Sequence, residues 1–136
     1  MIYKATIEKI VAIEEYEGLL LINIEDIKLL AIYWAFDDYI KHNIKVSSNI
    51  DIDLWLFDVD VKTVLNKKRI TNDTRTAGSH LFGKILKKMS DFEIRVDCGE
   101  LTFDIRSGEK IRFDINDYIE TEGSNQIFFP ENRMEL

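Results

Sequence analysis

The chain holds few side chains of the kinds that most often serve as nucleophile, proton shuttle or zinc ligand. It has one cysteine, Cys98, and two histidines, His42 and His80. Activation of the Cys98 thiol would need a neighbouring cation, and Asp97 and Glu100 would raise its pKa instead. The histidines lie in different segments without HxH, HExxH or CxxC spacing, and no glycine-rich phosphate loop occurs. We therefore expect no metal, no cofactor and no enzymatic activity.

Aspartates are densest in residues 50–61, as Asp51, Asp53, Asp58 and Asp60. The first two stand opposite the apolar positions 50, 52, 54 and 56, but from Trp55 onward the apolar side chains take the other parity. A one-residue change of face predicts a bulge or a sharp bend, by which one strand can serve two sheets or close a barrel. An EF-hand is excluded because no glycine follows at the sixth loop position. The aspartates therefore predict the solvated face of a strand.

A candidate binding face lies on the same strand. By alternation, Trp55 and Phe57 share one face, and Asp51 and Asp53 lie on that face too. Aromatic side chains beside acids are a usual make-up for an anchor that engages a basic partner, so these four residues are the predicted partner-binding residues. The alternative is that the two aromatic side chains belong to the core, where large apolar residues are usually buried.

Residues 66–79 form the polar break of the chain. This segment has fourteen residues, of which Lys67, Lys68, Arg69 and Arg75 are basic. Loops of this length without secondary structure are usually functional or linking. The basic residues are of a kind that contacts phosphate, but without interleaved aromatic residues a basic loop is more often only solvated.

These residues must be positioned by strands. Apolar alternation and turn signals predict an antiparallel meander over residues 92–119, with a third strand at residues 111–115. Further strands are expected at residues 2–14, 19–24, 27–35, 50–61, 80–89 and 126–129, and a short helix at residues 36–43. The spacing of turn signals indicates roughly ten to twelve short strands in all. We predict an all-β fold, a small barrel or two-sheet sandwich of short antiparallel strands, similar to the oligonucleotide-binding (OB) type, with at most one short helix.

The sequence also suggests an internal duplication within a single domain of residues 1–136. The candidate halves are residues 1–65 and 80–129, joined by the polar loop 66–79. Lys-Ile at residues 9–10 is matched by residues 84–85, and Asp-Tyr-Ile at residues 38–40 is matched by residues 117–119. The same order of long strand, hairpin, Asp-Tyr-Ile and closing strand then occurs twice.

Composition limits the class of function. A net charge of −7 argues against general affinity for nucleic acid, which needs a clustered positive surface. No apolar run approaches the ~20 residues that span a bilayer, and no targeting signal is visible, so we expect a soluble cytoplasmic protein that does not bind membranes.

Two functional hypotheses follow. The composition is similar to that of small acidic bacterial immunity proteins, which neutralise toxins such as nucleases, and this favours a non-catalytic module that binds a basic protein. The alternative is an OB-like nucleic-acid-binding protein that uses residues 66–79 and stacks bases on Tyr33 or Trp34. An enzyme with residues gathered from separate strands is a third option, without a positive feature behind it.

Overall fold

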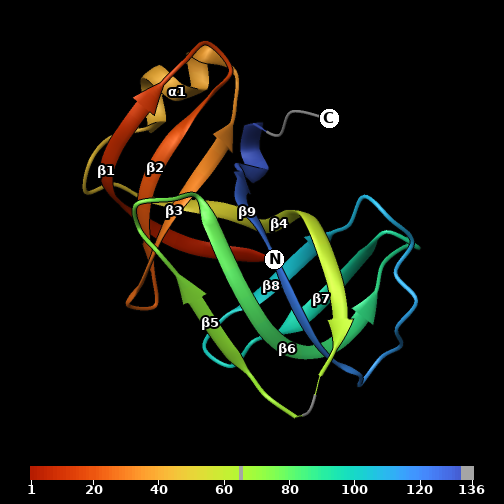
Figure 1. The fold of residues 1–136 in the computed structure, drawn as a ribbon. Helices are drawn as coiled ribbons and strands as arrows, with labels where there is room; N and C mark the ends of the chain where they lie inside the picture. Colours follow the sequence, from red (N-terminus) through yellow and green to blue (C-terminus); the bar gives the residue numbers. More distant parts are fainter. Residues whose placement is uncertain (65, 133–136) are drawn as a thin grey trace. The chain divides into compact units, whose positions relative to one another are not determined.

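The computed structural model describes residues 1–64 and 66–132, apart from the side chains of residues 58 and 59. Its elements are shown in Figure 1. They are β1 (Ile2–Ile13), β2 (Glu17–Ile24), β3 (Ile27–Trp34), α1 (Asp37–Asn43), β4 (Asn49–Thr63), β5 (Arg69–Asn72), β6 (Gly78–Lys88), β7 (Glu93–Asp97), β8 (Thr102–Arg106), β9 (Tyr118–Phe128) and the 3₁₀ helix η1 (Pro130–Asn132).

The strands pair in both parallel and antiparallel fashion. Their order is β1-β2-β3-β9-β4-β8-β7-β6-β5, and β1 also pairs with β4 and β6 with β9, so the sheet returns on itself. The fold is therefore mostly β, a closed mixed barrel with additional strands and one short helix. The described residues hold nine strands rather than the ten to twelve expected. An exclusively antiparallel barrel is also not found, because β3 pairs with β9, and β4 with β8, in parallel.

The chain divides into two compact units. We call residues 2–54, 73–77 and 125–132 the N-terminal unit, and residues 1, 55–64, 66–72 and 78–124 the C-terminal unit. Two strands pass from one unit to the other, β4 between Leu54 and Trp55 and β9 between Ser124 and Asn125. Before this point β4 pairs with β1, and after it with β8. The change of apolar face predicted at Trp55 thus coincides with a change of partner strand.

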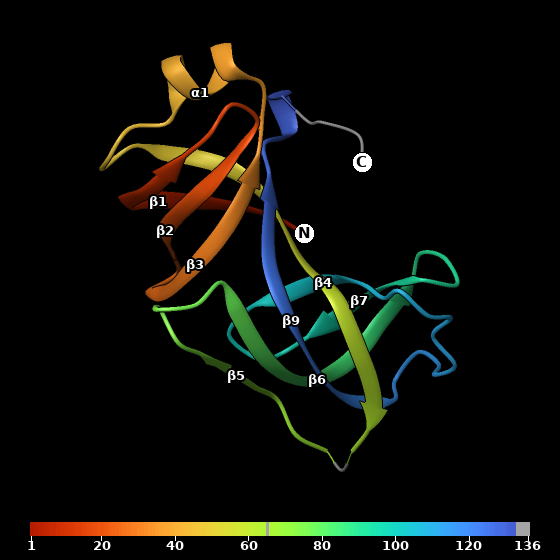
Figure 2. The ribbon, with the colours of Figure 1, turned by 45° about the horizontal axis from the view of Figure 1, so that its top comes forward.

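In the N-terminal unit, β1, β2 and β3 form an antiparallel sheet, as Figure 2 shows. The last residues of β9 extend this sheet in parallel, with Ile32 opposite Gln126. The short helix α1 follows β3, as expected: it has Asp37 and Asp38 in its first turn, where carboxylates favour the helix dipole, and it buries Ile40.

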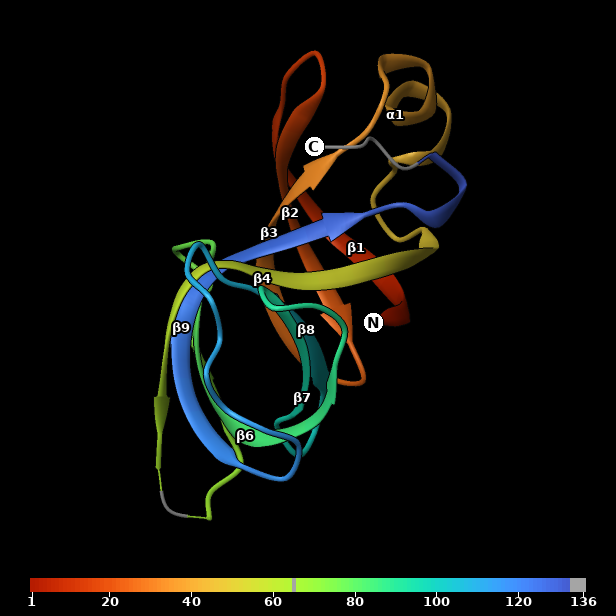
Figure 3. The same ribbon diagram turned by 90° about the vertical axis from the view of Figure 1, so that its right-hand side faces the viewer.

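In the C-terminal unit, β6, β7 and β8 form the corresponding antiparallel sheet. Figure 3 shows these strands and the first part of β9 curving round a common interior. That interior includes the fully buried side chains of Leu81, Ile85, Ile94, Phe103 and Ile105.

A buried charge lies on the opposite face of β8 from Phe103 and Ile105. The buried Asp104 accepts hydrogen bonds from Arg95 Nε at 2.8 Å and from the amino group of Met1 at 2.5 Å. Burial alone would raise the pKa of Asp104, but these two cations outweigh it and the pKa is lowered. The carboxylate is thus held in its charged form.

Three expectations about elements were wrong. The third meander strand does not form: residues 107–117 are a connection in which Ile111 is buried but Ile115 is 52% exposed. The final strand is much longer than residues 126–129, because β9 begins at Tyr118. The polar segment 66–79 is not free of structure, since it contains β5, which pairs with β6.

The two units repeat one arrangement along their long strands. In β1, the Ile7 carbonyl accepts a hydrogen bond from the Ser47 amide (2.7 Å). The Ile7 amide donates one to the carbonyl of the residue after Ser47 (2.9 Å). In β6, the Ile85 carbonyl likewise accepts a hydrogen bond from the Asn116 amide (2.8 Å), and the Ile85 amide donates one to the carbonyl of the residue after Asn116 (3.0 Å). Ser47 and Asn116 both have positive φ, 68° and 76°. A β-bulge follows Ile7 in β1 and Ile85 in β6.

The repetition extends to the hairpins. The Ala35 amide donates to the carbonyl of Tyr16 at 3.1 Å, and the Ser107 amide donates to the carbonyl of Phe92 at 2.9 Å. Tyr16 and Phe92 therefore hold equivalent places at the start of the second strand of each unit. We use this equivalence below to choose control variants.

The matching positions differ from those expected from the sequence. Ile85 corresponds to Ile7, not to Ile10. The two Asp-Tyr-Ile segments are not equivalent either, because residues 38–40 lie in α1, whereas residues 117–119 lead into β9. The duplication itself stays a prediction.

Candidate functional site

The four predicted partner-binding residues do not form one exposed face. Asp51 is exposed and pairs with Lys4 Nζ at 3.2 Å, whereas Asp53 and Trp55 are each only 7% exposed. Trp55 packs edge-on against Phe57, with ring centroids 5.9 Å apart. The burial of Trp55 corresponds to the alternative that its side chain belongs to the core. Whether any of the four residues binds a partner stays a prediction.

Other candidates for contacts with a partner are occupied within the chain. The Phe57 ring is half-buried, and the Arg106 guanidinium lies 5.7 Å from its centroid. Tyr33 is fully buried and Trp34 donates from Nε1 to Gln126 Oε1, so the expected base-stacking surface is not found at Tyr33. Of the aspartates considered above, the side chain of Asp58 lies outside the described residues.

Three of the four basic residues of segment 66–79 are also engaged within the chain. Lys67 Nζ lies 4.1 Å from the centroid of the Phe82 ring, and Lys68 Nζ pairs with Asp97 Oδ2 at 2.6 Å. Arg75 forms a bidentate pair with Asp73, with Nη2 to Oδ2 at 2.9 Å. These contacts leave less positive charge available for phosphate than the sequence alone indicates.

Cys98 is placed as a core residue. Burial, followed by the charge of Asp97, raises the pKa of its thiol to about 12. We therefore expect no reaction of the folded protein with iodoacetamide at pH 8 and complete labelling after unfolding in urea, measured by mass spectrometry. Rapid labelling of the folded protein would contradict this placement.

The histidines have local partners. His80 Nε2 lies 2.7 Å from Glu120 Oε2, and His42 Nδ1 lies 2.7 Å from the carbonyl oxygen of Asp38. Among the described residues, no three His, Cys, Asp or Glu side chains gather as a metal site would require. Within the same residues, no helix is both long and apolar enough to cross a bilayer.

An acidic and aromatic surface lies elsewhere, at the turn between β1 and β2. We call residues 13–17 and 36–38 the Tyr16 surface. Its two aromatic residues, Tyr16 and Phe36, are 47% and 49% exposed, and Ile13 beside them is 53% exposed. The two segments are joined by the hydrogen bond from Ala35 to Tyr16, and Figure 1 shows the β1–β2 turn and α1 at the same end of the strands.

The electrostatics of this surface are negative. Its carboxylates are Glu14, Glu15, Glu17, Asp37 and Asp38. A hydrogen bond with Glu15, the charge of Glu15 and the charge of Asp37 raise the pKa of Tyr16. The ion pair from Lys41 Nζ to Asp37 Oδ2, at 2.9 Å, offsets only part of this charge.

The equivalent position in the C-terminal unit differs in charge. Phe92 is 46% exposed and lies between Asp91 and Glu93. However, Asp91 pairs with Lys110 Nζ at 3.9 Å, and Glu93 lies opposite Arg106 in the β7–β8 ladder. The same backbone arrangement thus presents an acidic tip in one unit and a charge-balanced tip in the other. Sequence reasoning missed the Tyr16 surface, although the Glu-Glu-Tyr-Glu run was a usable signal.

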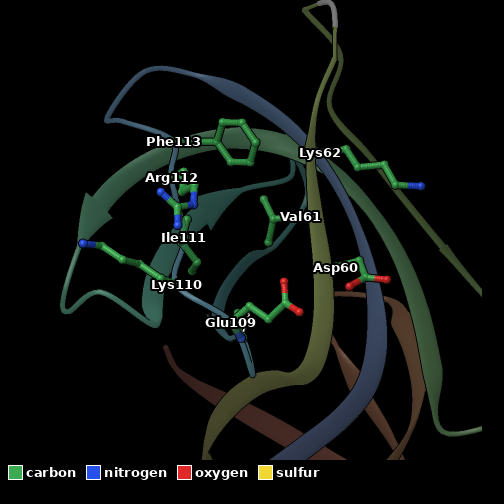
Figure 4. Close-up of a pocket in the computed structure, with 9 residues that line it drawn as sticks. Asp60, Val61, Lys62, Glu109, Lys110, Ile111, Arg112 and Phe113 are labelled. Carbon is green, nitrogen blue, oxygen red and sulfur yellow. Dashed lines mark hydrogen bonds between the residues drawn. The ribbon is translucent and has the colours of Figure 1, made fainter.

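The described residues of each unit also line a cavity of moderate size. In the C-terminal unit, a cavity of about 340 Å³ lies between β4 and residues 107–113, as Figure 4 shows. In the N-terminal unit, a cavity of about 460 Å³ lies between α1 and the start of β4, and its lining includes Lys4, His42 and Asp51. The second cavity places the predicted residue Asp51 in a strongly polar setting.

Comparison with known proteins adds no family. No protein-family model matches the chain, and neither a curated protein nor a solved structure matches it. The functional argument therefore rests on the surfaces and cavities of the chain itself.

Proposed function

We propose that the protein is a non-catalytic module that binds a basic protein partner through the Tyr16 surface. Such a module would act as an inhibitor of the bacterial immunity type, masking a basic protein such as a toxin nuclease. The observation that carries the proposal is the presence of two half-exposed aromatic side chains, Tyr16 and Phe36, beside five carboxylates at the β1–β2 turn and the start of α1.

The physical roles of the two kinds of side chain differ. Tyrosine and phenylalanine provide large apolar contact area with few rotatable bonds, which is why aromatic residues dominate binding hot spots. The surrounding carboxylates attract a basic surface and speed its association, more than they strengthen the final complex. The net charge of −7 of the whole chain acts in the same direction.

Nucleic acid is the weaker alternative for this chain. Three of the four basic side chains expected to contact phosphate are paired with Asp73 and Asp97 or lie over Phe82. Single-strand binding also needs exposed aromatic platforms in a positive groove, whereas the exposed aromatic residues of the Tyr16 surface lie among acids.

Replacement of Tyr16 by alanine should abolish the main anchor. A partner captured from the native host with the wild-type chain would be identified and then used in surface-binding kinetics. We expect Tyr16→Ala to weaken binding by about 2 kcal/mol or more, roughly 30-fold, mostly through faster dissociation. Phe92→Ala is the matched control, because Phe92 has an equivalent backbone setting and nearly the same exposure but a charge-balanced surrounding.

A charge reversal separates steering from anchoring. The double variant Glu14→Lys with Glu15→Lys should slow association and reduce its dependence on salt, while Asp51→Lys, whose charge is already offset by Lys4, should change little. Wild-type kinetics for both Tyr16→Ala and the double variant would refute the proposed surface. Tight binding of single-stranded DNA by the wild-type chain would instead favour the nucleic-acid alternative.

A further inference from the structure

The cavity of the C-terminal unit has an apolar floor. Val61, from β4, and Phe113 are half-buried, and Ile111 is buried. In Figure 4, Val61 is turned toward Glu109 and Phe113, while Asp60 and Lys62 extend from the other side of the strand, as alternation requires. A volume of about 340 Å³ is at the lower end of the range for sites that hold small molecules.

Two opposite charges border this floor without neutralising each other. Within the part of the chain that the structure describes, the Glu109 carboxylate and the Arg112 guanidinium make no ion pair. The neighbouring Lys110, in contrast, pairs with Asp91, and Figure 4 shows its side chain directed away from Val61. A charged group without a partner beside an apolar floor is available to a ligand of the opposite charge.

The equivalent connection in the N-terminal unit is built differently. There, the segment between Ala35 and Ser47 contains α1, whose Ile40 is buried and whose Tyr39 ring stacks near Phe129 at 5.2 Å. The segment between Ser107 and Asn116 is three residues shorter and contains no helix. It contributes one buried isoleucine, as α1 does, but leaves the cavity open beside it.

We propose that this cavity binds a small zwitterion with an aliphatic side chain, that is, a free amino acid such as leucine. The Glu109 carboxylate would repel a ligand that carries only a negative charge, and the Arg112 guanidinium would repel one that carries only a positive charge. Only a ligand with both charges can therefore pair with both groups. Arg112 takes the carboxylate in charge-assisted hydrogen bonds, Glu109 takes the ammonium group, and Val61 and Phe113 contact the aliphatic side chain. This site is independent of the Tyr16 surface.

The test uses the full chain and three probes. In an NMR titration of the ¹⁵N-labelled protein, leucine should shift the amide signals of residues 60–62 and 107–113 in a saturable manner. 3-Methylbutylamine, which lacks the carboxylate, and 4-methylpentanoate, which lacks the ammonium group, should each bind at least about tenfold more weakly, because each loses one charge-assisted contact.

Two variants test which side chain contacts each charged group of the ligand. Arg112→Gln should weaken leucine binding about tenfold but should not weaken 3-methylbutylamine, which loses a like-charged neighbour. Glu109→Gln should weaken leucine binding equally but should not weaken 4-methylpentanoate, for the same reason. Lys87→Gln is the control, since Lys87 is an exposed lysine of the same unit that does not line the cavity. No saturable shift with leucine, shifts elsewhere in the chain, or equal loss of all three probes in either variant would overturn the proposal.

Discussion

Phe103→Ala should lower the free energy of unfolding by about 3–5 kcal/mol, the usual range for emptying a buried phenylalanine site. Phe103 is fully buried in β8, where it lies opposite Val96 of β7 in the ladder. The loss has two parts, the transfer of the ring out of the core and the cavity that remains because the surrounding strands relax only partly. Urea denaturation followed by tryptophan fluorescence would measure it.

The control is Phe92→Ala, because Phe92 is the same residue type, close in the chain and 46% exposed. We expect a change of about 0.5 kcal/mol or less for this surface substitution. A loss below about 1 kcal/mol for Phe103→Ala would place the Phe103 ring outside the core, since surface substitutions rarely exceed ±0.5 kcal/mol.

Gly83→Ala should also be strongly destabilising, at the upper end of the ~1–3 kcal/mol that overpacking costs. A Cβ atom at position 83 would lie 2.4 Å from the carbonyl oxygen of Asp97 and 2.6 Å from Val96 Cγ1. The first of these atoms belongs to the backbone of β7, so the clash cannot be relieved by rotating a side chain. The β6–β7 pair would have to separate instead.

Gly108→Ala provides the comparison in the same unit. A Cβ atom there meets nothing within 4 Å, and Gly108 does not have positive φ. Because alanine reduces the freedom of the unfolded chain, this substitution should be neutral or stabilise by ~0.4–1 kcal/mol. Equal denaturation midpoints for the two variants would contradict the close approach of the backbones at Gly83.

Local patterns predicted those elements in which one face of a strand is buried. β1, β6, β7 and β8 were expected close to their actual bounds, because alternation of apolar and polar residues reports one buried face. β3 was also expected close to its bounds, but from a run of apolar residues, three of which are buried in succession. The same alternation at residues 111–115 did not make a strand. It is not paired in a ladder, and the chain turns through the positive φ of Asn116 directly afterwards. Alternation shows that a strand is possible, whereas pairing depends on distant residues.

The candidate site was less predictable for the same reason. The change of apolar parity at Trp55 coincides with a change of partner strand, but nothing local says that both faces of β4 are covered near this residue. The Tyr16 surface depends on the proximity of residues 13–17 and 36–38, which the β2–β3 hairpin establishes. The strand β5 was missed because an edge strand of four residues with one aliphatic side chain has no clear pattern.

Because β4 and β9 each belong to both units, the order of synthesis determines when their partner strands can pair. The parallel partner of β8 is β4, which has already been synthesised when β8 emerges. The parallel partner of β3 is residues 126–128 of β9, which are synthesised more than ninety residues after β3. Although domains generally fold from the N-terminal end during synthesis, here the edge of β3 stays open until residues 126–128 have emerged. Until then the nascent chain carries an unpaired edge, a hazard for aggregation.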